Sequence, residues 1–222
     1  RATNGRPYRN IYQNFIIENN RNIHLIHIKG SAEIMKIPML INRKNPMPPD
    51  YYPELMEISD DYFLEKNACK AMNALLKAAA KCGVKICIFS AYRSSTYQQK
   101  LFDDEVKIYT EQGYSYSDAL EKASQAVALP YTSEHNAGLA ADVSSPELFG
   151  QTTTAFDKTR QFEWLDKNAC KYGFILRYPK NKEHITGIMY EPWHYRYVGT
   201  PHACIIKENS LTLEEYIKKF PV

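Results

Sequence analysis

The strongest periodic pattern of apolar residues in this chain lies between residues 60 and 81. Apolar side chains recur there at intervals of three and four, the spacing that places them on one face of a helix; they are Leu64, Ala68, Met72, Leu75 and Ala79. We therefore predict a helix from about Asp60 to Lys81, with Ser59 or Asp60 as its N-cap. Gly83 follows the pattern and is expected to end the helix.

The chain beyond this helix predicts a sheet with further helices around it. Residues 84–91 are apolar on both faces, which is typical of a central strand covered on both sides. Further elements are predicted in this order: helices at 95–111 and 117–128, a strand at 138–144, a helix at 157–172, and strands at 174–178 and 185–190 that pair across a turn at 179–182. These elements show no regular strand–helix–strand repeat, so we predict an α+β fold with a central antiparallel sheet flanked by helices.

The first part of the chain differs from the rest in pattern. We interpret residues 1–44 as an N-terminal extension with short strands at 23–28 and 35–41, and residues 45–222 as a single catalytic domain. The three prolines of Asn45-Pro46-Met47-Pro48-Pro49 break regular structure at this boundary, because proline cannot donate to a strand ladder.

The last part of the chain predicts two helices that serve as scaffold. Thr200-Pro201 is typical of a helix start with proline at its first position. Thr212-Leu213-Glu214-Glu215 has the spacing of a capping box, in which the first and last side chains satisfy each other's backbone groups.

Composition and charge exclude several classes of function. The net charge is +3 and the 28 lysines and arginines are scattered, whereas nucleic-acid binding usually needs a basic stripe, so we expect no nucleic-acid partner. No apolar run approaches the roughly 20 residues that span a bilayer. The chain begins at Arg1, which we interpret as a mature or trimmed form, so that a membrane would be reached only through an anchor outside this sequence.

The five cysteines do not show the spacing of a zinc site. Cys69, Cys82, Cys87, Cys170 and Cys204 contain no C-x-x-C pair, and their odd number leaves at least one thiol unpaired. The count is compatible with one disulfide, which the spacing does not assign. We expect no cysteine among the metal ligands.

Residues with metal-binding chemistry gather in two short segments. Residues 133–143 place His135 and Asp142 seven positions apart, joined by small residues and by Gly138, which permits a close bend. Residues 191–194, Glu-Pro-Trp-His, add a second histidine and a second carboxylate. Each segment alone is also compatible with an accidental pairing of residues, and it is their combination that indicates a metal site.

Two imidazole nitrogens and one carboxylate oxygen suit zinc better than calcium or magnesium. We therefore predict His135, Asp142 and His194 as zinc ligands and Glu191 as the general base that acts on the metal-bound water. In a regular strand Glu191 and His194 would face opposite ways, so a bend or bulge at Pro192 is needed to turn both inward.

The end of the predicted strand at 84–91 is a second candidate location for function. Arg93 follows this strand directly and could present its guanidinium to a carboxylate or a developing oxyanion, and Gln98 lies one helical turn further on. From the residues alone, a surface salt bridge for Arg93 and a solvated helix face for Gln98 are favoured over these roles, because exposed arginines are the rule.

Taken together, these segments resemble a known family. The motifs are Tyr92-Arg93-Ser94, then Ser133-x-His135-x-x-Gly138-x-Ala140-x-Asp142, then Glu191-x-x-His194, with Tyr172-Gly173-Phe174 and Ile185-Thr186-Gly187 between them. In this order they resemble the VanY-type D-alanyl-D-alanine carboxypeptidases, which are M15 zinc peptidases sharing a fold with lysostaphin-type enzymes and the hedgehog domain. The resemblance runs from about Asn45 to the C-terminus. Tyr131 departs from it, because the family usually has glycine there.

The resemblance implies a function and roles for individual residues. It implies a zinc-dependent enzyme that removes the C-terminal D-alanine from peptidoglycan stem peptides, acting as a monomer outside the cell membrane of a bacterium. Arg93 would help Zn²⁺ stabilise the oxyanion, and Gln98 and Ser133 would hold the substrate near its C-terminus. Trp193 would wall the pocket, although a core position is equally open for it, as is a loop hydrogen bond for Ser133.

Two other functions remain open at this point. An LD-carboxypeptidase that trims tetrapeptide stems would use the same chemistry on a different substrate, and no sequence feature separates it from the DD-enzyme. A binding module on the same fold would have lost activity, but the presence of Glu191 and Arg93 argues against it.

Overall fold

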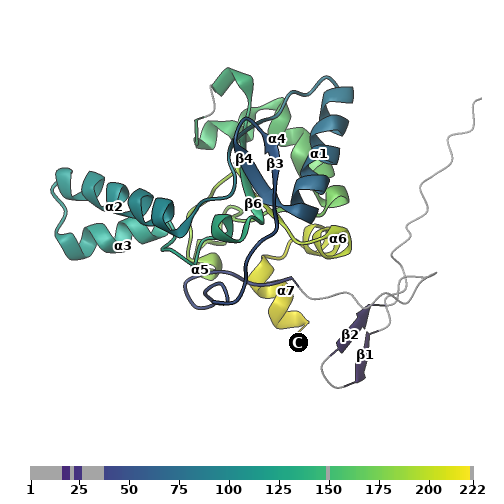
Figure 1. The fold of residues 1–222 in the computed structure, drawn as a ribbon, viewed down its shortest axis with the longest axis horizontal. Coiled ribbons are helices and arrows are strands. Elements are labelled where there is room, and N and C mark those ends of the chain that lie inside the picture. Colours follow the sequence, from purple (N-terminus) through teal and green to yellow (C-terminus); the bar gives the residue numbers. More distant parts are fainter. Residues whose placement is uncertain (1–16, 21–22, 27–37, 149–150, 221–222) are drawn as a thin grey trace, which may run out of the picture.

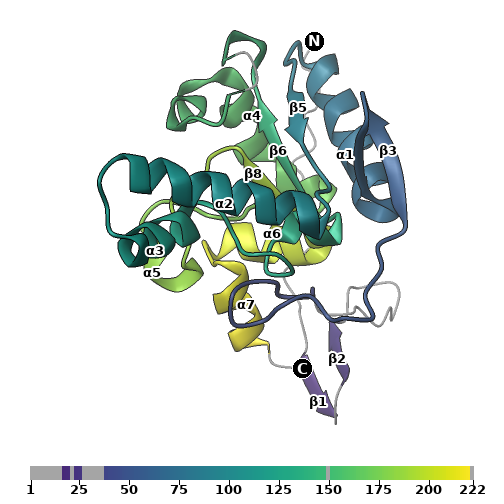
Figure 2. The same cartoon turned by 60° about the vertical axis from the view of Figure 1, so that its left-hand side comes forward.

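The computed structural model describes residues 17–20, 23–26, 38–148 and 151–220 of the chain. Its centre is a four-stranded sheet in which every neighbouring pair is antiparallel, with the order β5-β6-β8-β7. The strands are β5 (Cys87–Ser90), β6 (Ala140–Ser144), β8 (His194–Tyr197) and β7 (Phe174–Leu176). Helices lie around this sheet (Figures 1 and 2), so the predicted α+β class with a central antiparallel sheet is confirmed.

The described residues form seven α-helices and four short 3₁₀ helices. The α-helices are α1 (Lys66–Lys81), α2 (Ser95–Glu111), α3 (Tyr116–Ala126), α4 (Arg160–Asn168), α5 (Glu183–Thr186), α6 (Thr200–Glu208) and α7 (Leu213–Lys219). Short 3₁₀ helices are η1 (Glu134–Ala137), η2 (Pro146–Leu148), η3 (Thr154–Lys158) and η4 (Ala169–Tyr172). Figures 1 and 2 show α2 and α3 projecting as a hairpin on the side of the body opposite α1.

One face of the sheet packs on α1 and forms the main core. The apolar positions of the predicted helix are buried there, including Ala68, Met72 and Leu75. They belong to the same cluster of buried side chains as Val143 of β6 and Tyr195 of β8. Because strand side chains alternate between faces, the neighbours of Val143 and Tyr195 point to the other face of the sheet.

The predicted start of the first helix is wrong. Residues 55–65 form a β-hairpin instead, with β3 (Leu55–Ser59) paired to β4 (Tyr62–Glu65) across Asp60 and Asp61. Both aspartates have positive φ, 44° and 67°, which is the geometry of the two-residue turns that suit twisted strands. Helix α1 begins after the hairpin, where the Glu65 side chain accepts hydrogen bonds from two backbone amides as its N-cap.

The predicted central position of residues 84–91 is also wrong. Only Cys87–Ser90 forms a strand, and it lies at the edge of the four-stranded sheet. The central strand with both faces covered is β6, whose five residues are all buried. Residues 84–91 are largely apolar although they lie at the sheet edge, because the β3–β4 hairpin covers part of this edge. The hydrogen bond from Tyr92 N–H to Phe63 C=O joins the two.

The predicted strand at 185–190 does not exist. Residues 183–186 form the short helix α5, which ends at Gly187 with φ at 74°, and β7 pairs with β8 instead. Of the predicted strand at 35–41, the described residues 38–41 are not in a strand, and the remainder lies outside the described residues. The strand predicted at 23–28 is confirmed in its described part, where β2 (Ile23–Ile26) pairs with β1 (Ile17–Asn20).

Other predictions for the scaffold are confirmed. Thr212 and Glu215 form the capping box of α7, and Pro201 lies in the first turn of α6. None of the five cysteines forms a disulfide. Among the described residues, no helix combines the length and apolarity needed to cross a membrane.

Gly138 offers a test of the fold at the bend before β6. Gly138 and Gly187 both have positive φ, 67° and 74°, so alanine at either position is strained by about 1 kcal/mol. A Cβ at Gly138 would also lie 2.8 Å from the Glu65 backbone nitrogen, whereas nothing lies within 4 Å of one at Gly187. We expect Gly138→Ala to lower the free energy of unfolding by about 1–3 kcal/mol more than Gly187→Ala, measured by urea denaturation. Equal losses would contradict the close approach.

Candidate metal centre and active site

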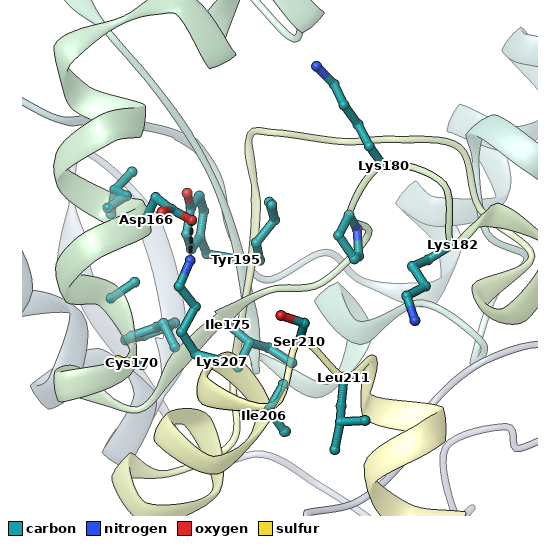
Figure 3. A pocket seen from close by; sticks show the side chains of 15 residues that line it. Asp166, Cys170, Ile175, Lys180, Lys182, Tyr195, Ile206, Lys207, Ser210 and Leu211 are labelled. Carbon is teal, nitrogen blue, oxygen red and sulfur yellow. Dashed lines mark hydrogen bonds and ion pairs between the residues drawn. The ribbon is translucent and has the colours of Figure 1, made fainter.

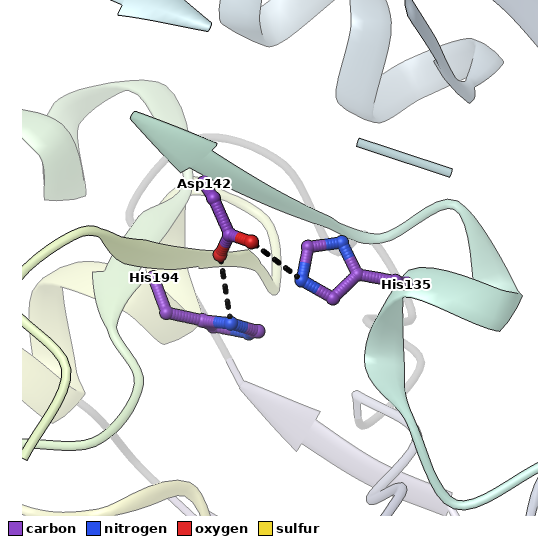
Figure 4. A group of neighbouring side chains, drawn as sticks. All are labelled: His135, Asp142 and His194. Atoms are coloured by element: carbon purple, nitrogen blue, oxygen red, sulfur yellow. Dashed lines mark ion pairs between the residues drawn. The ribbon is translucent and has the colours of Figure 1, made fainter. Parts of the chain in front are cut away.

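The pairing of β6 with β8 builds the centre of the site. Asp142 lies directly opposite His194 in the strand register, on the sheet face away from the α1 core. His135 joins them from η1, because Gly138 adopts left-handed φ and turns the chain from η1 into β6. One ligand atom from each of these three buried residues lies within 4.8 Å of the others (Figure 4).

Each histidine has one ring nitrogen held by the protein and the other facing Asp142. His135 Nδ1 lies 2.6 Å from the Ala91 carbonyl oxygen and donates to it, which leaves Nε2 3.3 Å from Asp142 Oδ2. His194 Nε2 lies 3.4 Å from the Glu134 carboxylate, and its Nδ1 lies 3.2 Å from Asp142 Oδ1. A second group that fixes the non-ligating nitrogen is a usual feature of histidine ligands to metals.

The donor set fits a zinc ion. Asp142 Oδ1 is buried, and its neighbour among the described residues is His194 Nδ1 at 3.2 Å. A bound cation would complete the environment of this buried carboxylate oxygen. Two imidazole nitrogens with one carboxylate oxygen match three-ligand catalytic zinc sites, which keep a further position for water or substrate.

The electrostatics of the metal-free centre differ between the two histidines. Burial and the Arg93 guanidinium lower the pKa of His135 to about 4, so its imidazole is neutral and its Nε2 is a free lone pair. Burial alone would lower the pKa of His194 as well, but hydrogen bonds to Asp142 and Glu134 outweigh it and raise that pKa to about 9. Burial raises the pKa of Glu191 to about 8.

Glu191 approaches the centre through a turn. The His194 N–H donates to the Glu191 carbonyl at 3.2 Å, and the Glu191 N–H donates to Tyr178. The chain therefore bends at Pro192 and Trp193, and β8 begins only at His194. This bend brings Glu191 Oε2 to 3.5 Å from His194 Nδ1, so both side chains point into the site as the sequence required.

Arg93 reaches the centre from the end of β5. Its Nη2 lies 2.5 Å from Asp142 Oδ2, and its Nε donates to Ser90 Oγ at 2.9 Å. The side chain is 18% exposed. The alternative of a surface salt bridge is therefore wrong, since Arg93 pairs with one of the candidate ligands inside the site.

A groove of about 510 Å³ opens over these residues and collects the other predicted side chains. Gln98, Ser133 and Trp193 all line it. Gln98 is 1% exposed, so a solvated helix face is excluded; its Nε2 donates to Ala128 C=O and its Oε1 has no partner among the described residues. Ser133 Oγ also accepts from the His135 N–H, and Trp193 also packs against the core, so both alternatives hold alongside the groove positions.

Comparisons with known proteins agree with this geometry. The profile of the family described as VanY, D-alanyl-D-alanine carboxypeptidase, matches residues 61–200. The chain belongs to the VanY family. It is 42% identical over 190 residues to a putative carboxypeptidase, YodJ, of Bacillus subtilis, covering 81% of this chain and 66% of the relative. It is 38% identical over 179 residues to a D-alanyl-D-alanine carboxypeptidase of Enterococcus faecalis, covering 81% and 65%. The chain thus spans just under two thirds of these relatives.

Solved structures of the family share the fold. A vancomycin-resistance VanY D,D-pentapeptidase variant in complex with Zn(II) is 39% identical, with a TM-score of 0.73 over 80% of this chain and 97% of that one. VanYB in complex with D-alanine-D-alanine is 38% identical, with a TM-score of 0.74 over 81% and 96%. The LdcB LD-carboxypeptidase is 36% identical, with a TM-score of 0.71 over 92% and 94%.

The family's usual glycine at position 131 has a structural counterpart here. Tyr131 has φ at 64°, in the left-handed region that glycine occupies without strain. Its backbone is held there by hydrogen bonds to Met47 and to the Asn136 side chain. The loop before the metal segment therefore keeps the glycine-like conformation despite the substitution.

Sequence reasoning missed a buried network beneath the site. Glu134 is 1% exposed, and its Oε1 accepts from Arg177 Nε at 2.7 Å and from Arg196 Nη1 at 2.6 Å. Arg177 also donates twice to Glu214 of α7. Burial would raise the pKa of Glu134, but the two guanidiniums hold it well below its usual range. The available signal was a charged residue within each of two otherwise apolar or aromatic strand segments, FILRY and HYRYV.

A second cavity lies on the opposite side of the sheet and has different chemistry. It measures about 260 Å³ and is lined largely by apolar residues of η4, β7 and α6. Figure 3 shows its ion pair between Lys207 and Asp166. The group His135, Asp142 and His194 is the candidate metal cluster found among the described residues, and none of the three lines this cavity.

The raised pKa of His194 predicts how metal binding depends on pH. A ligand nitrogen must be deprotonated, and in the metal-free protein His194 keeps its proton until the pH approaches about 9. Zinc affinity should therefore rise with pH between 6 and 8. At pH 7 we expect the release of at least about one proton per zinc bound. Calorimetry in buffers of different ionisation enthalpy measures this number, and zinc binding without proton release would contradict the protonation of His194.

Proposed function

We propose that this VanY-family chain is a zinc-dependent D-alanyl-D-alanine carboxypeptidase that removes the last residue of a peptidoglycan stem peptide. The observation that carries the proposal is the buried set of His135, Asp142 and His194, whose ligand atoms lie within 4.8 Å of one another, with Glu191 beside them in an open groove. The solved relatives with Zn(II) and with D-alanine-D-alanine support the metal and the substrate.

The metal would be held by His135 Nε2, His194 Nδ1 and Asp142. When bound, zinc supplies a Lewis acid that makes water more acidic and polarises the scissile carbonyl. The hydrogen bonds of His135 to Ala91 and of His194 to Glu134 keep the two ligand nitrogens directed at this position.

Glu191 is the proposed proton carrier. It is 7% exposed, and its burial raises its pKa to about 8. A raised pKa makes a carboxylate a stronger base towards the attacking water. In the reaction it takes a proton from the attacking water and delivers it to the amine of the departing D-alanine.

The side chains around the groove hold the substrate in place. Arg93 Nη1 has no partner among the described residues, so it is free for the substrate carboxylate or the oxyanion while Nε and Nη2 fix the guanidinium. Gln98 Oε1 can accept a substrate N–H, and Ser133 and Trp193 line the same groove as Glu191. We further propose that the protein works as a monomer at the cell wall, outside the membrane.

The alternative is an LD-carboxypeptidase, and the similarity to LdcB over 92% of this chain is the observation that favours it. Synthetic pentapeptide and tetrapeptide stems, incubated separately with zinc-loaded protein, distinguish the two by the mass of the product. Loss of D-alanine from the pentapeptide supports the proposed function, and cleavage of the tetrapeptide alone supports the alternative. Cleavage of neither stem would contradict both carboxypeptidase assignments.

Replacing Glu191 and His194 in turn distinguishes the role of a general base from that of a metal ligand. Glu191→Ala should keep bound zinc and lower kcat by about 10²–10⁴, the usual contribution of general acid–base catalysis, with little change in substrate affinity. His194→Ala is the matched comparison from the same turn and should lose zinc and activity together. Metal analysis and steady-state kinetics on the same preparations check this contrast. Loss of zinc from Glu191→Ala, or wild-type turnover by it, would show that the roles are wrongly assigned.

A further inference from the structure

The groove over the metal centre continues along α2 beyond the residues assigned to the reaction. On α2 its wall consists of Gln98, Leu101, Asp104, Glu105 and Ile108, a single stripe of the helix surface. Ile188 and Met189 also line the groove. Ile108 is 46% exposed and Met189 40%, so this part of the groove presents apolar surface that an extended peptide could cover.

Two polar groups on this stripe lack partners within the described part of the chain. Gln98 lines the groove, and its buried Oε1 makes no hydrogen bond. The half-buried Glu105 has neither a hydrogen bond nor an ion pair there. Asp104, its neighbour, is different because Lys100 pairs with it at 2.5 Å. The free amide oxygen and the free carboxylate indicate a ligand that supplies an N–H near Gln98 and a positive charge near Glu105.

Among the described residues, the part of the groove along α2 is lined by negatively charged side chains and by no positively charged one. Apart from Arg93 and the residues of the metal centre, its charged lining residues are Asp104 and Glu105. With Asp104 paired to lysine, Glu105 carries the uncompensated charge. A basic group is therefore favoured at this point and an acidic one is disfavoured.

The spacing relates Glu105 to the scissile bond. Seven residues separate it from Gln98, which is about 10 Å along a helix, the length of about three residues of an extended peptide. We propose that Glu105 is a specificity-determining residue that pairs with a cationic side chain two or three residues upstream of the bond cleaved. On the proposed function, the preferred substrates are stem peptides with a free amine on a diamino acid at that position.

A pair of peptides tests this inference. They share one pentapeptide sequence and differ only in whether the side-chain amine of the diamino residue is free or acetylated. Wild-type protein should favour the free amine by about two- to fivefold in kcat/KM, the usual range for a partly exposed ion pair. Glu105→Gln should lose this preference while processing the acetylated peptide at the wild-type rate. Asp103→Asn, which changes an exposed carboxylate of α2 outside the groove lining, should keep it.

Calorimetry measures how tightly the free-amine and acetylated peptides bind to Glu191→Ala. Because this measurement needs no cleavage, it tests the inference separately from the proposed function. Tighter binding of the free-amine peptide supports the role of Glu105 even if neither peptide is cleaved by wild-type protein, in which case only the proposed function falls. Equal binding of the two peptides, binding of neither, or a preference that survives in Glu191→Ala/Glu105→Gln overturns the inference. The preference should also weaken at high salt, because a partly exposed ion pair is screened.

Discussion

The burial of Glu134 between two arginines is the interaction on which the geometry of the site depends. Its carboxylate pairs with Arg177 and Arg196, both fully buried, and lies near the non-ligating nitrogen of His194, while Glu214 supplies the second negative charge to Arg177. Removing one member of such a buried charged set leaves an uncompensated charge, which typically costs about 3–5 kcal/mol. The position of His194 is therefore tied to the stability of the domain and not to local packing alone.

The same network joins distant parts of the chain to the metal centre. Arg177 donates to Glu214 on α7, and Arg196 donates to the carbonyl of Met39, which lies more than 90 positions before His135 in the sequence. Glu134 lies next to His135 in the sequence. One short segment therefore supplies the candidate ligand His135 and also the carboxylate that holds the other candidate histidine, His194. The C-terminal helix and the residues around Met39 thus help to fix the active site although neither contacts the groove beside Glu191.

In the paired strands β6 and β8, alternate side chains face the metal centre and the apolar core. Asp142 and His194 point to the site, whereas Val143 and Tyr195 on the other face enter the core with α1. A one-residue change of register would exchange these faces and place the ligands in the core. The apolar face therefore stabilises the register that the metal centre needs.

These relations explain which features the sequence could predict. The ligands, Glu191 and the bend at Pro192 follow from short motifs whose chemistry is local. Most helices follow from periodicity, but the β3–β4 hairpin was missed because Leu64 happens to lie in phase with the apolar face of α1. The edge position of β5 and the partner of β7 depend on pairing between distant segments, which no local pattern contains. Glu134, Arg177 and Arg196 were missed for the same reason, since each is meaningful only beside the others.

The central claim is that His135, Asp142 and His194 hold a catalytic zinc ion. Diffraction from zinc-loaded crystals, recorded on both sides of the zinc absorption edge, tests it most directly. The account predicts one strong anomalous peak at about 2.0–2.2 Å from His135 Nε2, His194 Nδ1 and an oxygen of Asp142, with Glu191 beside it and not bound to it. Absence of a peak there, or a peak at which Glu191 replaces one of the three ligands, would contradict the account.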